Sequence, residues 1–320
     1  MSTAAVSGDT SFIHEAAFYD SDGGLLEVVI PFLEEAVEAG EPAVAALDER
    51  GNGLVRAALG EPSSVLFVDG YAQHSRPANT VKAYQELFAE QVALGARQIR
   101  VVGKVPQPGV RAPWGWWARY EAAINRLYEG FPVWGICPYD TRITPERVLD
   151  EVTQTHPFLA SAGLHVPNPR FESPETFLSR ARRASPDPLE QTPPTVELID
   201  PSPAGARQAA HDTARVGQLD RVDVDDLVLV VNEAVTNGIC HGTRPIHARL
   251  WAGPDRIVVT VSDRGQGPTN PFVGLVPTSD TDSAGLGLWV THQLCNHVTF
   301  ETGAHGYTLR LVLGDPPPDL

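Results

Sequence analysis

The stretch VNEAVTN, from Val231 to Asn237, decides how this sequence is interpreted. It lies in a longer run, residues 224–240, whose apolar residues recur at the spacing of an α-helix. Glu233 and Asn237 are four residues apart, so both project from one face of that helix. A carboxamide oxygen suits Mg²⁺, and a carboxylate can position or deprotonate a nucleophile beside a phosphate. Taken alone, such a stretch is more often only a helix with a polar face.

A second block, residues 258–267, is an apolar strand that ends at Asp263 and continues into Gly265 and Gly267. An aspartate at a strand end can accept a hydrogen bond from an exocyclic amine such as the adenine N6. Glycines beside it let the backbone approach a ring closely. The plain alternative is a strand followed by a glycine-rich turn.

A third block, residues 283–289, opens a helix and contains Gly285, Leu286 and Gly287. Backbone N–H groups at a glycine-rich helix start can bind phosphate, although glycine can also serve packing there. Three such blocks in this order, between Leu227 and Leu313, are much harder to explain by chance than any one of them.

The ordered series NEAVTN, DRGQG, AGLGLW and GYTLRL resembles the N, G1 and G2 boxes of GHKL (Bergerat, HATPase_c) ATPases. Within that superfamily it is most similar to the anti-sigma-factor serine kinases, over residues 196–313. The resemblance implies a two-layer α/β sandwich that binds ATP and Mg²⁺. It assigns the residues as follows: Glu233 as catalytic base, Asn237 as Mg²⁺ ligand, Asp263 with Gly265 and Gly267 at the adenine, Gly285, Leu286 and Gly287 at the phosphates, and Thr308 near the adenine.

One departure concerns the expected lid, residues 268–284, which contains no Lys or Arg. The nearest cation is Arg264. Phosphate charge must then be met by Mg²⁺, backbone amides or a partner's residues. ATP binding is therefore better supported than fast phosphotransfer.

A proline-rich stretch, RASPDPLEQTPPTVELIDPSP over residues 183–203, separates two halves of the chain. We expect one domain over residues 11–182, a linker over 183–195 and the ATP-binding domain over 196–316. Upstream of the linker, predicted strands alternate with helices, which indicates parallel β-α-β units in a three-layer α/β/α domain. The expected strands lie near residues 42–47, 65–68, 98–102 and 131–137, and the expected helices near 24–39, 52–59, 79–94 and 116–128.

The first half also resembles a known family, the MEDS sensory domain. The resemblance covers residues 11–178 and implies a RecA-like fold with a largely parallel sheet that has lost its phosphate loop, used for sensing or docking. It is carried by His14 and Tyr19, Pro31-Phe32-Leu33, Ala39-Gly40-Glu41-Pro42, Trp114 to Tyr120-Glu121, Cys137-Pro-Tyr-Asp140, Thr155-His-Pro157 and Asn168-Pro169.

His14, Cys137 and His156 are candidates for a sensor site in this domain, because the strand ends of an α/β sheet are where ligands usually bind. A soft metal, a haem or a redox sensor would use such residues. The alternative, which the sequence favours, is that they pack locally. A cluster of aromatic residues is also open to more than one interpretation: it could line a pocket for an apolar ligand, or belong to the core or to a domain interface. Its members are Trp114, Trp116, Trp117 and Tyr120.

The formal net charge of −16 argues against direct binding to nucleic acid or to anionic membranes. The three cysteines, Cys137, Cys240 and Cys295, are widely spaced, which suits a reducing cytosol. We find no signal-peptide pattern and no apolar run long enough to span a bilayer, so we expect a cytoplasmic protein.

Taken whole, the chain resembles an actinobacterial anti-sigma regulatory factor with an attached sensor. That resemblance implies a protein serine kinase that holds a sigma factor, is released by a STAS-type anti-anti-sigma partner and phosphorylates a serine of that partner. Two alternatives stay open. One is a binding module that uses ATP without catalysis. The other is a histidine-kinase-like enzyme, for which His211 lies on a candidate helix before the first block, although the spacing is too short for a helical hairpin. The sequence does not decide whether the chain forms a homodimer.

Overall fold

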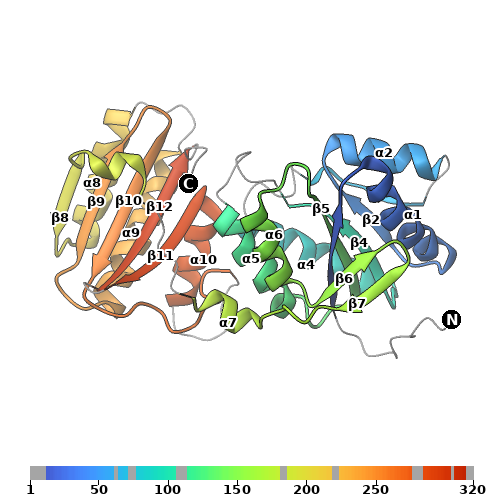
Figure 1. Ribbon diagram of the computed structural model, residues 1–320. Helices are drawn as coiled ribbons and strands as arrows, with labels where there is room; N and C mark the ends of the chain where they lie inside the picture. Colours follow the sequence, from blue (N-terminus) through green and yellow to red (C-terminus); the bar gives the residue numbers. More distant parts are fainter. Residues whose placement is uncertain are drawn as a thin grey trace. The chain divides into compact units, whose positions relative to one another are not determined.

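The computed structural model describes residues 12–60, 64–70, 77–105, 114–180, 186–217, 223–275, 284–303 and 306–314. Its contacts divide the chain into two compact units. The first holds the described residues up to 70, together with 79–105 and 118–177. The second holds residues 178–314 with the short segments 77–78 and 114–117. Each unit has its own sheet (Figure 1).

The first unit is built on a seven-stranded sheet in the order β3-β2-β4-β5-β1-β6-β7. Neighbouring strands are parallel, apart from the antiparallel β6–β7 hairpin at one edge. Its strands are β1 (Ile13–Tyr19), β2 (Ala43–Ala46), β3 (Leu66–Phe67), β4 (Ile99–Gly103), β5 (Val133–Asp140), β6 (Phe158–Ser161) and β7 (Leu164–Pro167). Its helices are α1 (Asp22–Glu38), α2 (Glu49–Leu59), α4 (Pro77–Ala93), α5 (Trp114–Leu127), α6 (Glu146–Thr155) and α7 (Pro174–Leu178).

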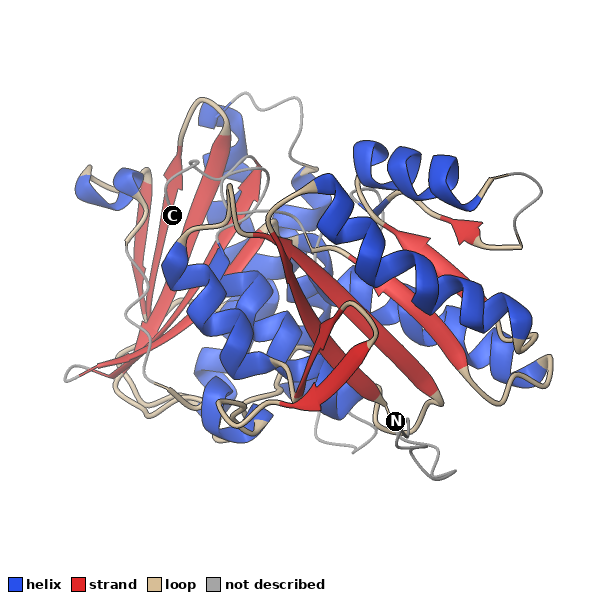
Figure 2. Ribbon diagram, turned by 45° about the vertical axis from the view of Figure 1, so that its right-hand side comes forward, coloured by secondary structure: helices blue, strands red, loops and turns tan. Residues whose placement is uncertain are grey.

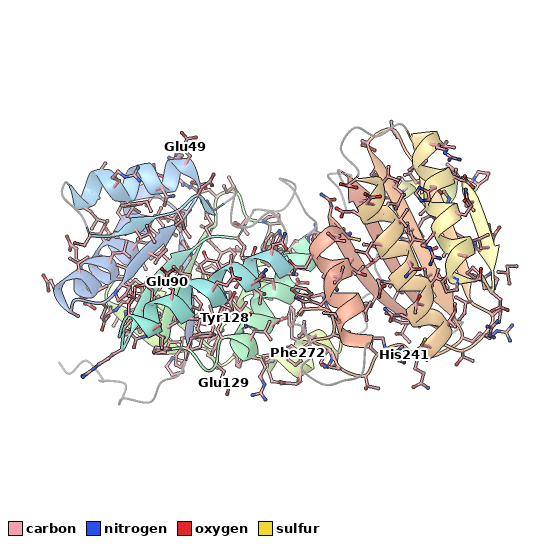
Figure 3. The ribbon with its side chains drawn as sticks, turned by 180° about the vertical axis from the view of Figure 1, so that it is seen from behind. Glu49, Glu90, Tyr128, Glu129, His241 and Phe272 are labelled. Carbon is pink, nitrogen blue, oxygen red and sulfur yellow. The ribbon has the colours of Figure 1, made fainter. Side chains whose placement is uncertain are left out.

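Helices cover both faces of this sheet, as the helix and strand colouring of Figure 2 makes visible. On one face, α1 and α2 pack over a core that includes Phe32, Leu33 and Val55. On the other face lie α4 and α5, whose side of the sheet carries Val101 and Cys137. Tyr128, at the end of α5 (Figure 3), sets its ring edge-on to Phe88 of α4. The predicted three-layer arrangement with a mostly parallel sheet is confirmed.

The second unit has a five-stranded sheet in the order β11-β12-β10-β9-β8, with every neighbouring pair antiparallel. Helices lie on one face of it, which confirms the predicted two-layer sandwich (Figure 1). Its elements are β8 (Val196–Ile199), α8 (Pro203–Gly217), α9 (Val224–His241), β9 (His247–Ala252), β10 (Arg256–Asp263), α10 (Ala284–Leu294), β11 (His297–Gly303) and β12 (Gly306–Gly314).

Strand alternation decides which side chains of this sheet meet the helices. Val259 and Val261 of β10 face α9, and an ideal Cβ on Gly238 of α9 would lie 3.5 Å from Val261 Cγ1. The intervening residues, such as Val258, face the opposite side and pack with Trp251 and Val312. Asp263 therefore continues the helix-facing set at the end of the strand.

Part of the predicted linker packs onto this opposite face. A short 3-10 helix, η1 (Pro188–Gln191), is preceded by Asp187, whose carboxylate binds the Arg256 guanidinium with two contacts of 2.8 and 2.9 Å. Leu189 packs against the apolar cluster on this face, and Glu190 pairs with Arg310. The described part of the proline-rich segment is thus tied to the second unit by buried contacts.

Candidate nucleotide site and a buried polar cluster

Helix α9 begins and ends with defined caps, which fixes the register of its site residues. The Asp223 side chain accepts a hydrogen bond from the Asp225 N–H at the start, and Gly242 closes the end after the exposed His241 (Figure 3). Its apolar face, including Leu227 and Val231, is fully buried. Burial of each such side chain contributes about 1.5–3 kcal/mol.

Glu233 and Asn237 of α9 lie directly against the start of α10. A Cβ on Gly287 of α10 would overlap Glu233 Oε2 and would lie 3.7 Å from Asn237 Nδ2. The structure therefore brings together the first and third blocks of the sequence, and a larger residue at position 287 would require the Glu233 carboxylate to move. Gly285 lies in the first turn of α10, and the Leu286 side chain is exposed.

The Asn237 amide nitrogen is buried and has no hydrogen-bond partner within the described residues. A buried polar group without a partner is costly, so such groups mark places where a ligand completes the bonding. The carboxamide oxygen and the neighbouring carboxylate are hard donors of the kind that Mg²⁺ takes. These residues fit a bound Mg–nucleotide.

Asp263 ends β10 on the helix-facing side and is 8% exposed. Its Oδ1 accepts hydrogen bonds from the backbone N–H groups of Thr243, at 3.0 Å, and Gly265, at 2.6 Å. Its Oδ2 makes no hydrogen bond within the described part of the chain. A Cβ on Gly242 or Gly265 would lie within 2.8 Å of this carboxylate. Backbone thus holds one oxygen in place and leaves the other to accept a bond from a ligand.

Tyr307, rather than Thr308, is the residue of β12 beside Asp263. In the register of β10 and β12, Asp263 pairs with Tyr307 and Ser262 with Thr308. The Thr308 hydroxyl donates to Ser262 Oγ, 3.0 Å away, on the face that η1 partly covers. Because side chains alternate along a strand, the structure does not bring Thr308 together with Asp263. Gly267, at φ +73°, instead lies against the Tyr307 ring.

Residues 276–283 of the expected lid, residues 268–284, lie outside the described residues. Arg207 of α8, which the sequence patterns did not indicate, is linked to Glu233 through Asn232. Arg207 donates to Asn232 Oδ1 at 2.8 Å, and Asn232 Nδ2 lies 3.3 Å from Glu233 Oε1. This chain of hydrogen bonds orients the Glu233 carboxylate.

In the first unit, the three candidate sensor residues meet, and Glu121 of α5 joins them. His14 is on β1 and Cys137 on the adjacent β5, with both side chains on the face that α5 covers. His156 follows α6 directly. Ligand atoms of His14, Glu121, Cys137 and His156 all lie within 4.8 Å of one another.

This cluster is almost completely buried, apart from a partly exposed Cys137. His14 is 1% exposed, and Glu121 and His156 are fully buried. Loss of solvation lowers the pKa of His14 to about 4 and that of His156 to about 3, so both imidazoles are neutral at neutral pH. Burial, and then the Glu121 carboxylate, raise the pKa of the Cys137 thiol well above its usual range.

Glu121 was missed as a site residue by the sequence patterns. The available signal is a charged residue inside an otherwise apolar and aromatic helix face, between Trp117 and Ile124. All four aromatic residues that the sequence singled out at the start of α5 are buried. One of them, Tyr120, lines a cavity of about 40 Å³ beside His14, Glu121 and Cys137.

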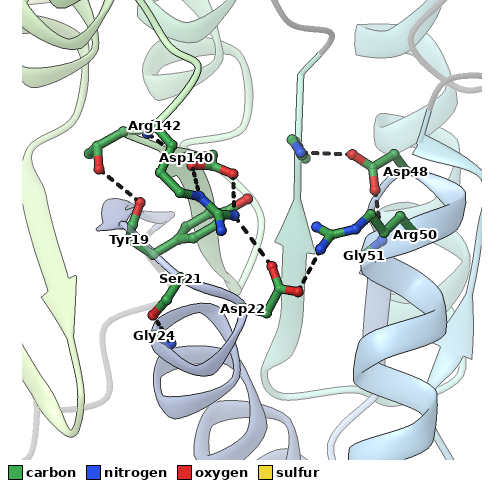
Figure 4. Close-up of polar contacts among 11 residues, drawn as sticks. Tyr19, Ser21, Asp22, Gly24, Asp48, Arg50, Gly51, Asp140 and Arg142 are labelled. Carbon is green, nitrogen blue, oxygen red and sulfur yellow. Dashed lines mark hydrogen bonds and ion pairs between the residues drawn. The ribbon is translucent and has the colours of Figure 1, made fainter.

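At the carboxyl ends of the parallel strands, ion pairs join residues that follow different strands (Figure 4). Asp22, at the start of α1, binds Arg50 at 2.5 Å and Arg142 at 3.3 Å. Arg142 also holds Asp140, and it lowers the pKa of that carboxyl. Lys104 pairs with Asp48 at 2.7 Å. The cations of this edge are thus already matched by carboxylates.

Comparison with known domain families matches a part of each unit to one family. Residues 200–313 match the histidine kinase-like ATPase domain. Residues 13–157 match MEDS, the methanogen/methylotroph DcmR sensory domain. These matches confirm the two domain resemblances found in the sequence.

Among solved structures, one match is the nucleotide-free catalytic domain of the histidine kinase ThkA. It is 14% identical, and the match covers 38% of this chain and 99% of that domain with a TM-score of 0.27. The comparison with curated proteins found no match. Within the described residues, no helix combines the length and apolar character needed to cross a membrane.

Proposed function

We propose that this chain is an anti-sigma-type regulator that binds ATP with Mg²⁺ in its second unit and exchanges protein partners under control of its sensory unit. The observation that carries the proposal is the contact of Gly287 with Glu233 and Asn237 on the helix side of the sheet, with Asp263 at the adjacent strand end. Asn237 would hold Mg²⁺, and Asp263 Oδ2 would accept a hydrogen bond from the adenine amine.

ATP with Mg²⁺ supplies the phosphoryl group in this proposal. Glu233 Oε2 faces Gly287, at the third block. From there it would take the proton of a serine hydroxyl on the anti-anti-sigma partner. Arg207, through Asn232, keeps the carboxylate oriented for that role.

The acidic balance of the chain, −16 overall, supports a sigma factor with a basic surface as the other partner, because complementary charge speeds encounter. The second candidate is a non-catalytic module in which bound ATP only shapes the partner surface. The specific observation in its favour is the absence of Lys and Arg from residues 268–284 of the sequence. A histidine-kinase-like reaction has less support, since His211 is an exposed residue of α8, close before α9.

The test is recovery of partners from native cells with the full chain, followed by phosphotransfer. We expect a sigma factor and a STAS-type protein to be recovered and to exchange with the nucleotide state. Mass spectrometry then should find phosphoserine on the STAS-type protein after incubation with the chain and MgATP. Glu233→Gln should abolish the transfer while leaving ATP affinity little changed.

Other outcomes decide between the candidates. Recovery of both partners without phosphoserine would support the non-catalytic module. Transfer that persists in Glu233→Gln would remove the role given to that residue, and phosphohistidine on the chain would favour the histidine-kinase-like reaction. Recovery of neither partner class by a chain that binds MgATP would contradict the anti-sigma proposal.

A further inference from the structure

The buried cluster of the first unit has the donor set of a transition-metal site. Two imidazoles, one thiol and one carboxylate converge from four elements that lie far apart in the sequence. Nitrogen and sulfur donors select ions such as Zn²⁺ over Mg²⁺ or Ca²⁺. A thiolate and a carboxylate together would also balance the charge of a divalent cation, which removes the cost of burying either charge alone.

Four of the six donor-to-donor distances in the cluster bracket the spacing expected around one tetrahedral ion, and all six are within 4.8 Å. His14 Nε2 lies 3.1 Å from Glu121 Oε2 and 3.4 Å from Cys137 Sγ. Glu121 Oε2 lies 3.5 Å from His156 Nε2 and 4.0 Å from Cys137 Sγ. With zinc bonds of about 2.0–2.3 Å, tetrahedral geometry separates donor atoms by about 3.3–3.8 Å.

The tautomer of His14 is fixed by its neighbour Asn125. The Asn125 amide nitrogen donates to three backbone carbonyls, those of Glu121, Ala122 and Thr155, which sets the amide orientation. Its Oδ1 must then accept from His14 Nδ1, 3.1 Å away. His14 Nε2 consequently presents a lone pair to the centre of the cluster.

His156 is held in the same way. Its Nδ1 lies 2.8 Å from the Val152 carbonyl oxygen, which can only accept, so the proton is on Nδ1. Its Nε2 is buried and makes no hydrogen bond within the described residues. Oxygen acceptors on the outer nitrogens of both imidazoles are the usual second shell of metal-binding histidines. Tyr139 adds to that shell by donating to Glu121 Oε1 at 3.0 Å.

We propose that His14, Glu121, Cys137 and His156 bind one divalent first-row transition-metal ion of the Zn²⁺ type. On binding, the sulfur–metal bond forms as the thiol proton leaves to solvent. Three of the four ligands, His14, Glu121 and Cys137, also line the small cavity beside Tyr120. Since the site lies wholly in the first unit, it is independent of the proposed nucleotide chemistry.

The test is titration of the tag-free, chelator-treated full chain with Co²⁺, a coloured substitute for Zn²⁺. We expect one Co²⁺ per chain, a thiolate-to-cobalt charge-transfer band and the intense visible bands of a tetrahedral site, all removed by Zn²⁺. Cys137→Ser should lose the charge-transfer band. His156→Ala should bind at least about tenfold more weakly, since even outer-shell changes cost about 10–100-fold.

Matched controls separate this site from adventitious binding. Cys240→Ser, at the exposed cysteine, and His165→Ala, at a partly exposed histidine of the same unit, should leave the titration unchanged. Asn125→Ala should weaken binding, because His14 Nδ1 then loses its acceptor.

A chain that is folded by circular dichroism yet takes up no stoichiometric Co²⁺ or Zn²⁺ would overturn the proposal. A charge-transfer band that survives Cys137→Ser but disappears in Cys240→Ser would also overturn it. ATP titration of the same samples reports separately on the second unit.

Discussion

At the scale of single residues, the Asp263 carboxylate is the part of the nucleotide site whose role can be tested by one substitution. One carboxylate oxygen is held by two backbone N–H groups, and the other makes no hydrogen bond within the described residues. Asp263→Asn preserves the held oxygen but replaces the second one with an amide donor, which would oppose the adenine amine. We expect ATP affinity to fall about tenfold or more, because hydrogen bonds to charged groups contribute roughly 1.5–3 kcal/mol.

Thr308→Val is the matched control for that change. Thr308 lies on the opposite face of the sheet, where its hydroxyl bonds to Ser262. Competition with a fluorescent ATP analogue should give this variant the affinity of the parent chain. A large loss in Thr308→Val, with none in Asp263→Asn, would refute the assignment of faces.

His297 gives the second unit a predictable response to acid. Burial, with a smaller effect from Arg310, lowers the pKa of His297 from 6.5 to about 4. The unfolded chain therefore binds the proton first. Neutral, buried His297 therefore makes its full contribution to the free energy of unfolding above pH 6.5. That free energy falls by about 3 kcal/mol as the pH is lowered from 6.5 to about 4. His297→Gln, which does not titrate, should flatten this part of the pH profile of unfolding free energy, and an unchanged profile would contradict the interpretation.

At the scale of elements, the contact between α9 and α10 sets the geometry of the site. Gly287→Ala would place a methyl group on the Glu233 carboxylate, so either Glu233 or α10 must move. We expect MgATP binding to weaken by about 1–3 kcal/mol, the range for overpacking, while the fold is retained. Gly303→Ala, where an added Cβ meets nothing within 4 Å, should bind MgATP normally in the same calorimetric assay. Equal behaviour of the two variants would contradict this account of the contact.

The docking of η1 on the second sheet rests on the buried pair between Asp187 and Arg256. Asp187→Ala leaves the guanidinium buried without its bidentate partner, which costs about 3–5 kcal/mol. The surface pair of Glu197 and Arg249 provides the control, because exposed pairs contribute only about 0–1 kcal/mol. Hydrogen exchange of β10 and β12 amides should accelerate in Asp187→Ala and barely change in Glu197→Ala. Similar protection in both variants would show that η1 is not held by this pair.

Element prediction from the sequence succeeded where periodicity was strong. Helix α9 was expected over residues 224–240 and spans Val224–His241, because its apolar face is continuous. Strand β1 was not predicted, although it lies between β5 and β6, since His14 and Glu15 interrupt its apolar run. The β6–β7 hairpin was also missed, and all four residues of β7 are exposed, so burial imposed no pattern on them.

At the scale of the whole molecule, the sequence predicted two α/β units and the order of the nucleotide blocks, and the domain matches support both. Two features could not be predicted, because they depend on which strand neighbours which. One is the entry of Glu121 into the cluster with His14, Cys137 and His156. The other is the face occupied by Thr308, which the register of β10 and β12 determines.

The central claim is that the second unit holds one Mg–nucleotide through the residues of its three blocks. Isothermal titration calorimetry of the full chain with ATP tests it most directly. We predict saturable binding of one ATP per chain in the presence of Mg²⁺, weakened by EDTA and by Asn237→Ala. A folded chain that shows no saturable binding, or that binds ATP equally well after Asp263→Asn and Gly287→Ala are combined, would contradict the account.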